Sequence, residues 1–368
     1  MSRQKIVHLT SVHQPFDTRI FYKECTTLVQ AGYEVTLIAP HDRDGPTGSV
    51  QIHAIPTPAS RNERMKRTVR QVYRAAMEED GDLYHFHDPE LFPVGVWLKL
   101  RGKKVVYDIH ENLPAQILGK TYLRPALFRR IVARGAVLSE KLAAQLFDGL
   151  VIANPRVAER FSGAHVITLA NYPLIAMIDG ASPAGGADKP VAIYVGGLTE
   201  IRGVCELIDA AALLDGAVEL WLIGPWASDS FRARCMAKSG WRQVRYWGYV
   251  TPEEVYGYLK NADIGLATLH PQHNYLTNLP VKAFEYMASS LPIVMADFPY
   301  WREVFEGAAL FVDPMSPQAI AEAVRHLLAH PEEARRMSAR GRDLVKTRYS
   351  WEAEAKKLLA LYKQILEN

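Results

Sequence analysis

The fold is decided by Leu279-Pro280-Val281-Lys282-Ala283-Phe284-Glu285-Tyr286-Met287-Ala288, followed at once by Ser289-Ser290-Leu291-Pro292-Ile293-Val294-Met295-Ala296-Asp297. The first part predicts a helix with Pro280 in its first turn and Asn278 or Leu279 as its cap. The second part predicts a turn and then a buried strand. The N-terminus of such a helix offers free N–H groups and a positive dipole end to a phosphate. Glu285 lies about one and a half turns further in, where a carboxylate can accept hydrogen bonds from ribose hydroxyls.

Strand and helix patterns alternate on both sides of this stretch. Small residues and prolines over 182–190 interrupt the alternation, which then restarts. The pattern predicts an α/β chain with two doubly wound parallel sheets. The clearest expected strands are Lys5–Thr10, Glu34–Ala39, Val50–Ile55, Leu83–His87, Lys104–Ile109, Val191–Val195, Glu219–Ile223, Ile264–Ala267 and Ala309–Val312, and the clearest helices are Arg19–Ala31, Arg61–Glu79, Leu127–Phe147, Val204–Leu214 and Pro317–Ala329.

Composition favours a globular protein of the reducing compartment. The chain has 368 residues, of which 48% are hydrophobic, and its net charge is +3. No apolar run reaches the roughly 18 residues that a membrane span requires. The chain enters a strand directly after its start, which leaves no room for a signal peptide. Three widely spaced cysteines predict free thiols rather than disulfides or a zinc site. We therefore expect a cytoplasmic protein.

Residues 279–297 resemble the signature of the family 4 glycosyltransferases, which are retaining enzymes of the GT-B fold. In that family a glutamate of this helix holds the ribose of a nucleotide sugar. The resemblance covers nearly the whole chain and implies two facing Rossmann-like domains. It implies an acceptor-side domain at residues 1–177, a nucleotide-sugar-binding domain at 178–349, and a C-terminal helix within 350–368 that crosses back to the first domain.

The segment Tyr194–Gly203 predicts a strand, a glycine turn and a cation just before a helix. The family usually has a Gly-Arg pair and then Lys-Gly here, whereas this chain has Gly197 and Arg202 at the places of the arginine and the lysine. Arg202 offers a positive fork for a diphosphate. The alternative is a tight turn at Gly196 and Gly197 with a solvated Arg202. Further donor-side candidates are Gly224 at the end of the next strand, Tyr249, Val281 and Lys282.

The family pattern also has a glutamate eight positions before Glu285, where it contacts the donor sugar. This chain has Thr277 at that position. Thr277 and Asn278 can hydrogen-bond sugar hydroxyls, although they bring no charge. The nucleotide contacts expected of Arg202 and Glu285 are unaffected.

Polar residues follow two strands of the first half. The resemblance assigns to His110 a histidine that binds the donor sugar, and Glu111 beside it is a candidate acceptor-side carboxylate. Alternation along a strand places His85 and His87 on one face, where they could share an ion. The family works without a metal and lines its acceptor pocket with this strand end. We therefore favour an acceptor-side role for His87 and Asp88, and we expect no metal site.

Two further acceptor-side candidates follow the first strand. Asp17 suits the N-cap of the helix that comes next, and Arg19 is expected to point towards the bound ligand.

In the same half, the basic stretch Arg61–Arg74 has apolar residues at helical spacing, which is typical of a helix on an anionic membrane surface. The alternative is a solvated face of a helix packed on its own sheet. Nucleic acid is not an expected partner, because no basic-aromatic motif accompanies the charge.

Together these features predict a retaining hexosyltransferase that needs no cofactor and no metal. The donor would be a UDP- or GDP-type nucleotide sugar, and the acceptor a glycan or a lipid-linked glycan. His110, Arg202 and Glu285 are the predicted catalytic residues. The expected location is the cytoplasm, with peripheral contact to the inner membrane. Two alternatives are a GT-B-fold nucleotide-sugar epimerase and a non-catalytic nucleotide-sugar-binding protein.

Overall fold

The computed structural model describes residues 3–110, 112–119, 125–163 and 165–367 and divides the chain into two compact units. The first unit contains residues 1–171 and 351–368, and the second contains Tyr172–Ser350. The boundary expected after residue 177 falls inside α8 (Ile175–Gly180), which packs on α11 (Pro252–Lys260) of the second unit. The ring of Tyr172 already contacts Phe284, at 5.0 Å between centroids. The chain therefore changes unit before residue 177.

The first unit is built on an eight-stranded sheet in the order β3-β4-β2-β1-β5-β6-β7-β8, in which only the β3–β4 pair is antiparallel. Strand order reverses between β1 and β5, and doubly wound sheets bind ligands beyond the carboxyl ends of their strands at such a point. The strands are β1 (Lys5–Leu9), β2 (Glu34–Pro40), β3 (Gly45–Thr47), β4 (Val50–Ile55), β5 (Leu83–Phe86), β6 (Lys104–Ile109), β7 (Gly149–Ile152) and β8 (Val166–Thr168).

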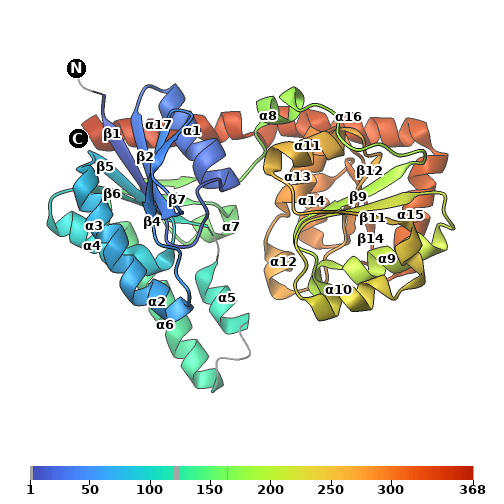
Figure 1. Cartoon of the computed structure of the whole chain (residues 1–368), viewed down its shortest axis with the longest axis horizontal. Helices are drawn as coiled ribbons and strands as arrows, with labels where there is room; N and C mark the ends of the chain where they lie inside the picture. The colour runs from blue at the N-terminus through green and yellow to red at the C-terminus, as the bar shows by residue number, and fades with distance from the viewer. Residues whose placement is uncertain (1–2, 111, 120–124, 164, 368) are drawn as a thin grey trace. The chain divides into compact units, whose positions relative to one another are not determined.

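Helices cover both faces of this sheet (Figure 1). The last helix, α17, returns to the first unit, where the indole of Trp351 donates to Thr27 Oγ1 at 2.9 Å. The α-helices of the unit are α1 (Thr26–Gln30), α2 (Arg61–Glu63), α3 (Val69–Glu79), α4 (Phe92–Leu100), α5 (Leu113–Gly119), α6 (Ala126–Leu146), α7 (Pro155–Ala158) and α17 (Trp351–Glu367). Two π-helices, η1 (Thr18–Cys25) and η2 (Arg64–Thr68), and the 3₁₀ turn η3 (Pro89–Leu91) complete it.

Two helices that the sequence predicts as continuous contain π-helical segments in the structure. The expected helix over 19–31 begins as η1, and the expected helix over 61–79 contains η2. A π-helix bonds residues five apart, which brings Arg19 and Glu24 onto one side of η1. Arg19 Nε lies 3.0 Å from Glu24 Oε1. The wider turn is thus accompanied by a buried ion pair that an α-helical spacing does not favour.

The second unit has a six-stranded parallel sheet in the order β11-β10-β9-β12-β13-β14, with its reversal between β9 and β12. Its strands are β9 (Val191–Val195), β10 (Glu219–Ile223), β11 (Val244–Gly248), β12 (Ile264–Ala267), β13 (Ile293–Ala296) and β14 (Ala309–Val312). Besides α8 and α11, its helices are α9 (Val204–Leu213), α10 (Asp229–Met236), α12 (His273–Thr277), α13 (Val281–Ala288), α14 (Pro299–Phe305), α15 (Pro317–Ala329) and α16 (Pro331–Arg348), with 3₁₀ turns η4 (Glu200–Arg202) and η5 (Ser239–Gln243).

The helix expected within Leu279–Ala288 is α13, and it starts slightly later than expected, at Val281. Pro280 is itself the cap residue, with an extended backbone (φ −79°, ψ 114°) and no side-chain cap bond. Neither Asn278 nor Leu279 takes the cap position, because the extended Pro280 separates them from the first helical turn. Within the described residues, no helix combines the length and apolar character needed to cross a membrane.

Candidate functional site

Two cationic side chains converge on the end of β9 in the second unit. A Cβ built on Gly196 would lie 3.1 Å from Arg202 Nη1 and 3.2 Å from Lys282 Nζ. Gly196 has φ 130°, a backbone conformation that side chains rarely adopt. The glycine turn therefore leaves space in which Arg202, from η4, and Lys282, from α13, approach the same point. The sequence predicted both residues as donor-side, but not that they meet.

Lys282 is the more unusual of the two cations. Its Nζ is buried, has no hydrogen-bond partner among the described residues, and lies 3.5 Å from the centroid of the Tyr194 ring. Burial and then the charge of Arg202 lower the pKa of Lys282 well below its usual range, whereas Glu285 acts to raise it. A buried ammonium without an acceptor is costly, so this position suits an anionic ligand.

Glu285 lies further along α13, as predicted. The hydroxyl of Tyr256, from α11, donates to Glu285 Oε1 at 3.3 Å. On the neighbouring position, Tyr286 ties the helix to the sheet: its hydroxyl accepts from Val195 N at 3.0 Å and donates to Leu266 O at 3.3 Å. These contacts fix α13 against β9 and β12, the two strands that flank the reversal of strand order.

The remaining donor-side candidates surround the same sheet edge. Gly224 follows β10, and a Cβ there would lie 2.2 Å from Gly196 O, so the two strand ends pack too closely for any side chain. Tyr249, after β11, is 72% exposed. Thr277 ends α12, and Asn278 accepts a hydrogen bond from the Trp301 indole at its carbonyl oxygen. Val281 begins α13. A Cβ built on Gly197 would lie 3.3 Å from Arg202 Nη1.

In the first unit, a buried carboxylate organises the end of the sheet around His110. Asp108 Oδ2 lies 3.1 Å from His110 Nε2, 3.3 Å from His87 Nδ1 and 2.9 Å from Arg19 Nε. Burial acts to raise the pKa of Asp108, but Arg19 and then His110 hold it well below its usual range. Burial lowers the pKa of His87 to about 4. Asp108 is therefore an ionised acceptor that orients both imidazoles.

Two cavities open at this edge of the sheet. The first has a volume of about 270 Å³ and is lined by residues that include His13, His87, Asp88 and His110. Asp88 is held in place by the Thr10 hydroxyl at 2.7 Å and by Ser11 N at 2.6 Å. The second cavity, of about 470 Å³, lies beyond β1, β2 and β4, and its lining includes Phe16, His41 and Arg64. Arg64 Nε pairs with Glu90 Oε1 at 2.7 Å.

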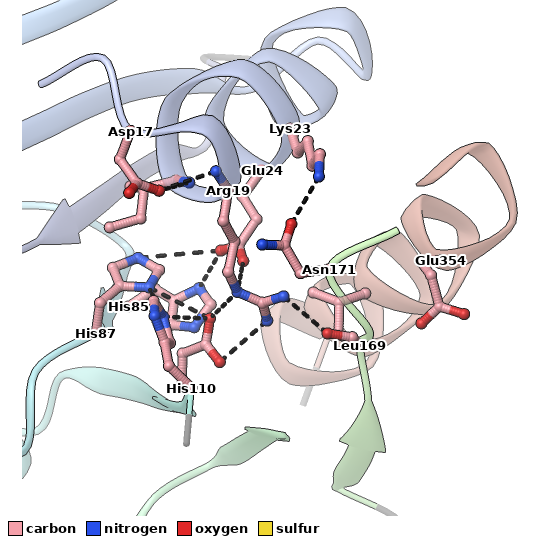
Figure 2. A network of polar contacts seen from close by, with 12 residues as sticks. Asp17, Arg19, Lys23, Glu24, His85, His87, His110, Leu169, Asn171 and Glu354 are labelled. Carbon is pink, nitrogen blue, oxygen red and sulfur yellow. Dashed lines mark hydrogen bonds and ion pairs between the residues drawn. The ribbon is translucent and has the colours of Figure 1, made fainter. Parts of the chain in front are cut away.

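The remaining acceptor-side candidates are Asp17, Arg19 and Glu111. Asp17 caps η1 as predicted, accepting from Arg19 N at 2.9 Å and Ile20 N at 3.0 Å. Arg19 was expected to point towards the bound ligand, and the structure differs from that expectation. Its guanidinium is buried and bonds Asp108 twice and Leu169 O at 2.8 Å (Figure 2). It does not line either cavity described above. Glu111 lies outside the described residues.

Sequence reasoning missed Asp108, Glu24 and His13. Asp108 carried a usable signal, because a carboxylate inside an apolar parallel strand requires buried partners. Glu24 carried none, since its partners on β1 and β5 are distant in sequence. His13 lies in the loop after β1. Its Nδ1 is 3.1 Å from Asp17 Oδ2, and its Nε2 is 3.6 Å from Asp88 Oδ1. His13 therefore contacts both the N-cap residue of η1 and a residue that lines the cavity.

Comparison with known families and proteins agrees with the resemblance found in the sequence. Residues 18–162 match the family described as Glycosyltransferase Family 4, and residues 189–330 match the one described as Glycosyl transferases group 1. The chain is 28% identical over 193 residues to the lipopolysaccharide core biosynthesis glycosyltransferase LpsD of Rhizobium meliloti, covering 52% of this chain and 53% of that protein. It is 25% identical over 283 residues to a GDP-mannose-dependent alpha-(1-6)-phosphatidylinositol dimannoside mannosyltransferase of Mycobacterium tuberculosis, covering 73% and 69%. The first match thus spans about half of that relative.

Solved structures match over nearly the full chain. Sucrose-phosphate synthase from Thermosynechococcus elongatus superposes with a TM-score of 0.76 at 18% identity, covering 99% of this chain and 100% of that one. Anabaena HepE in complex with UDP-glucose gives a TM-score of 0.73 at 14% identity, covering 98% and 100%. At this identity the likeness shows the fold alone. The GT-B class predicted from the sequence is confirmed.

Proposed function

This chain belongs to glycosyltransferase family 4, and from that premise we propose that it transfers a sugar from a nucleoside diphosphate sugar to a glycan or lipid-linked acceptor. The observation that carries the proposal is the convergence of Arg202 and Lys282 on Gly196. Two cations at a strand end, beside the helix that carries Glu285, match a diphosphate followed by a ribose. The relatives support transfer over the epimerase or non-catalytic alternatives, because each is named as a transferase.

We propose that the transfer retains the configuration of the sugar and uses no metal at the diphosphate. The bond between the anomeric carbon and the phosphate oxygen breaks, and its electron pair leaves with the diphosphate. The acceptor hydroxyl forms the new bond on the same face, and its proton passes to the departing phosphate oxygen. Arg202 and Lys282 stabilise the charge that develops on the leaving group. No protein nucleophile takes part.

In the first unit, His110, oriented by Asp108, remains the proposed sugar-binding residue. The cavities beside His87 and Asp88, and beside Phe16 and Arg64, are the candidate places for the acceptor. A UDP- or GDP-type donor is supported by the relatives, since one is GDP-mannose-dependent and Anabaena HepE was solved with UDP-glucose. A thermal-shift panel of UDP- and GDP-sugars tests this, because a ligand that binds the folded state raises the melting temperature. No shift with any nucleotide sugar or nucleoside diphosphate would contradict it.

Replacing Lys282 by methionine is expected to stabilise the ligand-free protein while weakening nucleoside diphosphate binding. The buried Nζ has no hydrogen-bond partner in the described structure. Its removal relieves the cost of burying an amine that has no acceptor, partly offset by the lost contact with Tyr194, and we expect a net gain of about 1–2 kcal/mol. The bound diphosphate loses a charged partner at the same time. Thermal melts with and without nucleoside diphosphate measure both effects.

The exposed Lys346 of α16 provides the matched control. Lys346→Met should change neither the melting temperature nor the nucleotide affinity appreciably. The lowered pKa of Lys282 adds a second measurement. A bound diphosphate raises that pKa again, so binding takes up a proton once the pH exceeds the pKa of the free protein, and affinity then falls as pH rises. A methionine variant that binds nucleotide like wild type would exclude Lys282 from the site.

We propose that the protein is cytoplasmic and contacts an anionic membrane surface through α6. The sequence placed this contact on Arg61–Arg74, but the apolar side of that helix is buried in the core of its own unit, at Val69, Val72 and Ala76. The helix α6 extends beyond the sheet with α5 packed along it (Figure 1). It exposes a stripe of apolar side chains: Leu127, Phe128, Ile131, Leu138, Leu142 and Leu146. Arg130, Arg134 and Lys141 are exposed on the same helix. A basic helix with an exposed apolar stripe is suited to the headgroup region of a bilayer.

Vesicle sedimentation tests the membrane contact. The wild-type chain is expected to sediment with anionic vesicles at low salt and to detach as salt rises, because each basic residue near such a surface contributes roughly 1 kcal/mol. Leu138→Ser combined with Leu142→Ser should reduce the bound fraction several-fold. Leu100→Ser is the control, since Leu100 is 79% exposed in the same unit but lies on α4. Equal binding by the α6 variant, or none by wild type, would contradict the proposal.

A further inference from the structure

We propose that the first unit binds one Zn²⁺ ion through a buried set of four side chains: His8, Glu24, His85 and His87. These four residues belong to the first unit, whereas Arg202 and Lys282 belong to the second. The strand pattern allowed an ion shared by His85 and His87, although an acceptor-side role was expected for His87 and Asp88. In the structure, His87 borders the cavity, whereas His85 is not part of its lining.

The topology of the sheet brings the four side chains together. His8 of β1 and His85 of β5 are register partners in adjacent parallel strands. His87 follows two residues after His85 and therefore faces the same side of the sheet. Glu24 comes from η1, which carries it onto that side together with Arg19 (Figure 2). His8, Glu24 and His85 are fully buried, and His87 is 2% exposed.

The distances between the candidate ligand atoms suit a tetrahedral ion. Glu24 Oε2 lies 3.9 Å from His8 Nδ1, 3.6 Å from His85 Nδ1 and 3.9 Å from His87 Nε2. His8 Nδ1 and His87 Nε2 are 2.9 Å apart. One ligand atom from each of the four residues lies within 4.8 Å of every other. Zinc bonds of about 2.0–2.1 Å separate tetrahedral ligands by about 3.3–3.4 Å, which falls within the observed spread.

The outer contacts direct lone pairs towards the centre of the cluster. His87 Nδ1 lies 3.3 Å from Asp108 Oδ2 and 3.1 Å from His110 Nε2. A proton on Nδ1 that is donated to this carboxyl oxygen leaves Nε2 free to bind. His8 Nε2 lies 3.3 Å from the Tyr362 hydroxyl, which leaves His8 Nδ1 as the inward atom. The histidine–carboxylate contact is the usual outer support of a metal-bound imidazole. The Tyr362 hydroxyl also lies 2.8 Å from His85 Nδ1. It would give up this contact when Nδ1 binds the ion, because one imidazole lone pair cannot serve both.

The charges of the cluster leave a place for a cation. Arg19 bonds both oxygens of Asp108, at 2.9 Å and 3.1 Å, and that pair is balanced. The Glu24 carboxyl lies beside the same guanidinium, and burial raises its pKa well above the usual range, so it would bind a cation by giving up its proton. Its Oε2 accepts no hydrogen bond within the described structure. Three imidazoles and one carboxylate favour Zn²⁺ over Mg²⁺ or Ca²⁺, which prefer oxygen ligands. Four protein ligands without an open position are typical of a structural ion.

Such an ion would join β1, β5 and η1 behind the cavity. Binding at His87 Nε2 keeps the Nδ1 proton towards Asp108, and Asp108 in turn accepts from His110. The ion thus positions the cavity histidine without contacting a ligand in the cavity.

Metal analysis of the full chain, purified without a histidine tag, tests the inference. Elemental mass spectrometry is expected to find about one zinc per chain. Chelation should lower the melting temperature by about 5–15 °C, because a tightly bound ion stabilises the folded state. Added Co²⁺ should restore the melting temperature and give the visible absorption of a tetrahedral site. A chain that holds no zinc, takes up no Co²⁺ and melts alike with and without chelator would show a metal-free hydrogen-bond network instead.

Three variants locate the ion. His85→Gln should lose zinc. His110→Gln should keep it, although His110 forms a second, three-residue group with His87 and Asp108. His326→Gln should also keep it, and this control removes the surface pair in which His326 Nε2 lies 2.9 Å from Glu333 Oε2. Zinc that depends on His110 or His326 but not on His85 would overturn the proposed site. If His85→Gln does not fold, the wild-type metal content and Co²⁺ spectrum still decide.

Discussion

Replacing Arg202 by alanine is expected to lower kcat for sugar transfer by about two to three orders of magnitude. The guanidinium approaches the glycine turn after β9, with Nη1 3.1 Å from a Cβ position on Gly196. There it would meet charge that grows on the diphosphate as the sugar–phosphate bond breaks. Such a contact is stronger in the transition state than in the ground state, so donor affinity should change less than kcat. Transfer kinetics and donor binding, measured on the same variant, separate the two effects.

Two companion variants sharpen the Arg202 experiment. Arg202→Lys should recover part of the rate, because a point charge still serves a phosphate. Arg234→Ala is the control: its guanidinium pairs with Glu200 at 2.9 Å in the same unit and is exposed. Transfer that is indifferent to Arg202 would place the diphosphate elsewhere. A wild-type chain that binds nucleotide sugar tightly but transfers to no acceptor would instead favour a non-catalytic nucleotide-sugar-binding protein. Thr277, at the place of a family glutamate, fits that alternative.

Replacing Glu285 by alanine is expected to weaken nucleoside diphosphate binding by roughly 2–4 kcal/mol, or about 30- to 1,000-fold in Kd. A carboxylate that accepts two ribose hydroxyls makes charge-assisted hydrogen bonds, and the alanine variant loses both. Titration calorimetry with the nucleoside diphosphate measures the loss. A melting temperature close to wild type confirms that the variant is folded.

Tyr256→Phe distinguishes ribose binding from a structural role of Glu285. Tyr256 donates to Glu285 Oε1 at 3.3 Å, and phenylalanine removes that bond while filling the same space. If Glu285 acts mainly by holding Tyr256, both variants should weaken binding equally. We expect the phenylalanine variant to retain most of the affinity. A folded Glu285→Ala protein with unchanged nucleotide affinity would remove Glu285 from the proposed site.

Local patterns were sufficient to predict most of the elements that carry the site. Val191–Val195, Glu219–Ile223 and Ile264–Ala267 were expected as strands with the bounds that the structure has. Asp17 was expected to cap a helix, and it does. These features depend on apolar runs, turn residues and side-chain-to-backbone bonds within a few residues. The order of the strands, and hence its reversal beside β9 and β1, was not readable from the strand patterns and comes from the structure.

Burial was the property that local patterns could not supply. Arg61–Arg74 and α6 both combine basic and apolar residues, but the first hides its apolar side in the core and the second exposes it. A helical pattern shows that one face of the helix is apolar, but it does not show what covers that face. In the same way, a lysine in the first turn of a helix is usually solvated, whereas the Nζ of Lys282 is buried against the Tyr194 ring beside the glycine turn that follows β9.

The sequence by itself determined the two parallel α/β sheets, the glycine turn with Arg202 and the helix with Glu285, because each is written in residues that are close together in the chain. Only the tertiary structure decided that Lys282 joins Arg202, that Arg19 is committed to Asp108, and that Glu24 meets three histidines. These contacts join segments that are separated by tens of residues. Their partners are selected by the register of parallel strands and by the π-helical turn of η1, neither of which has a local sequence signal of its own.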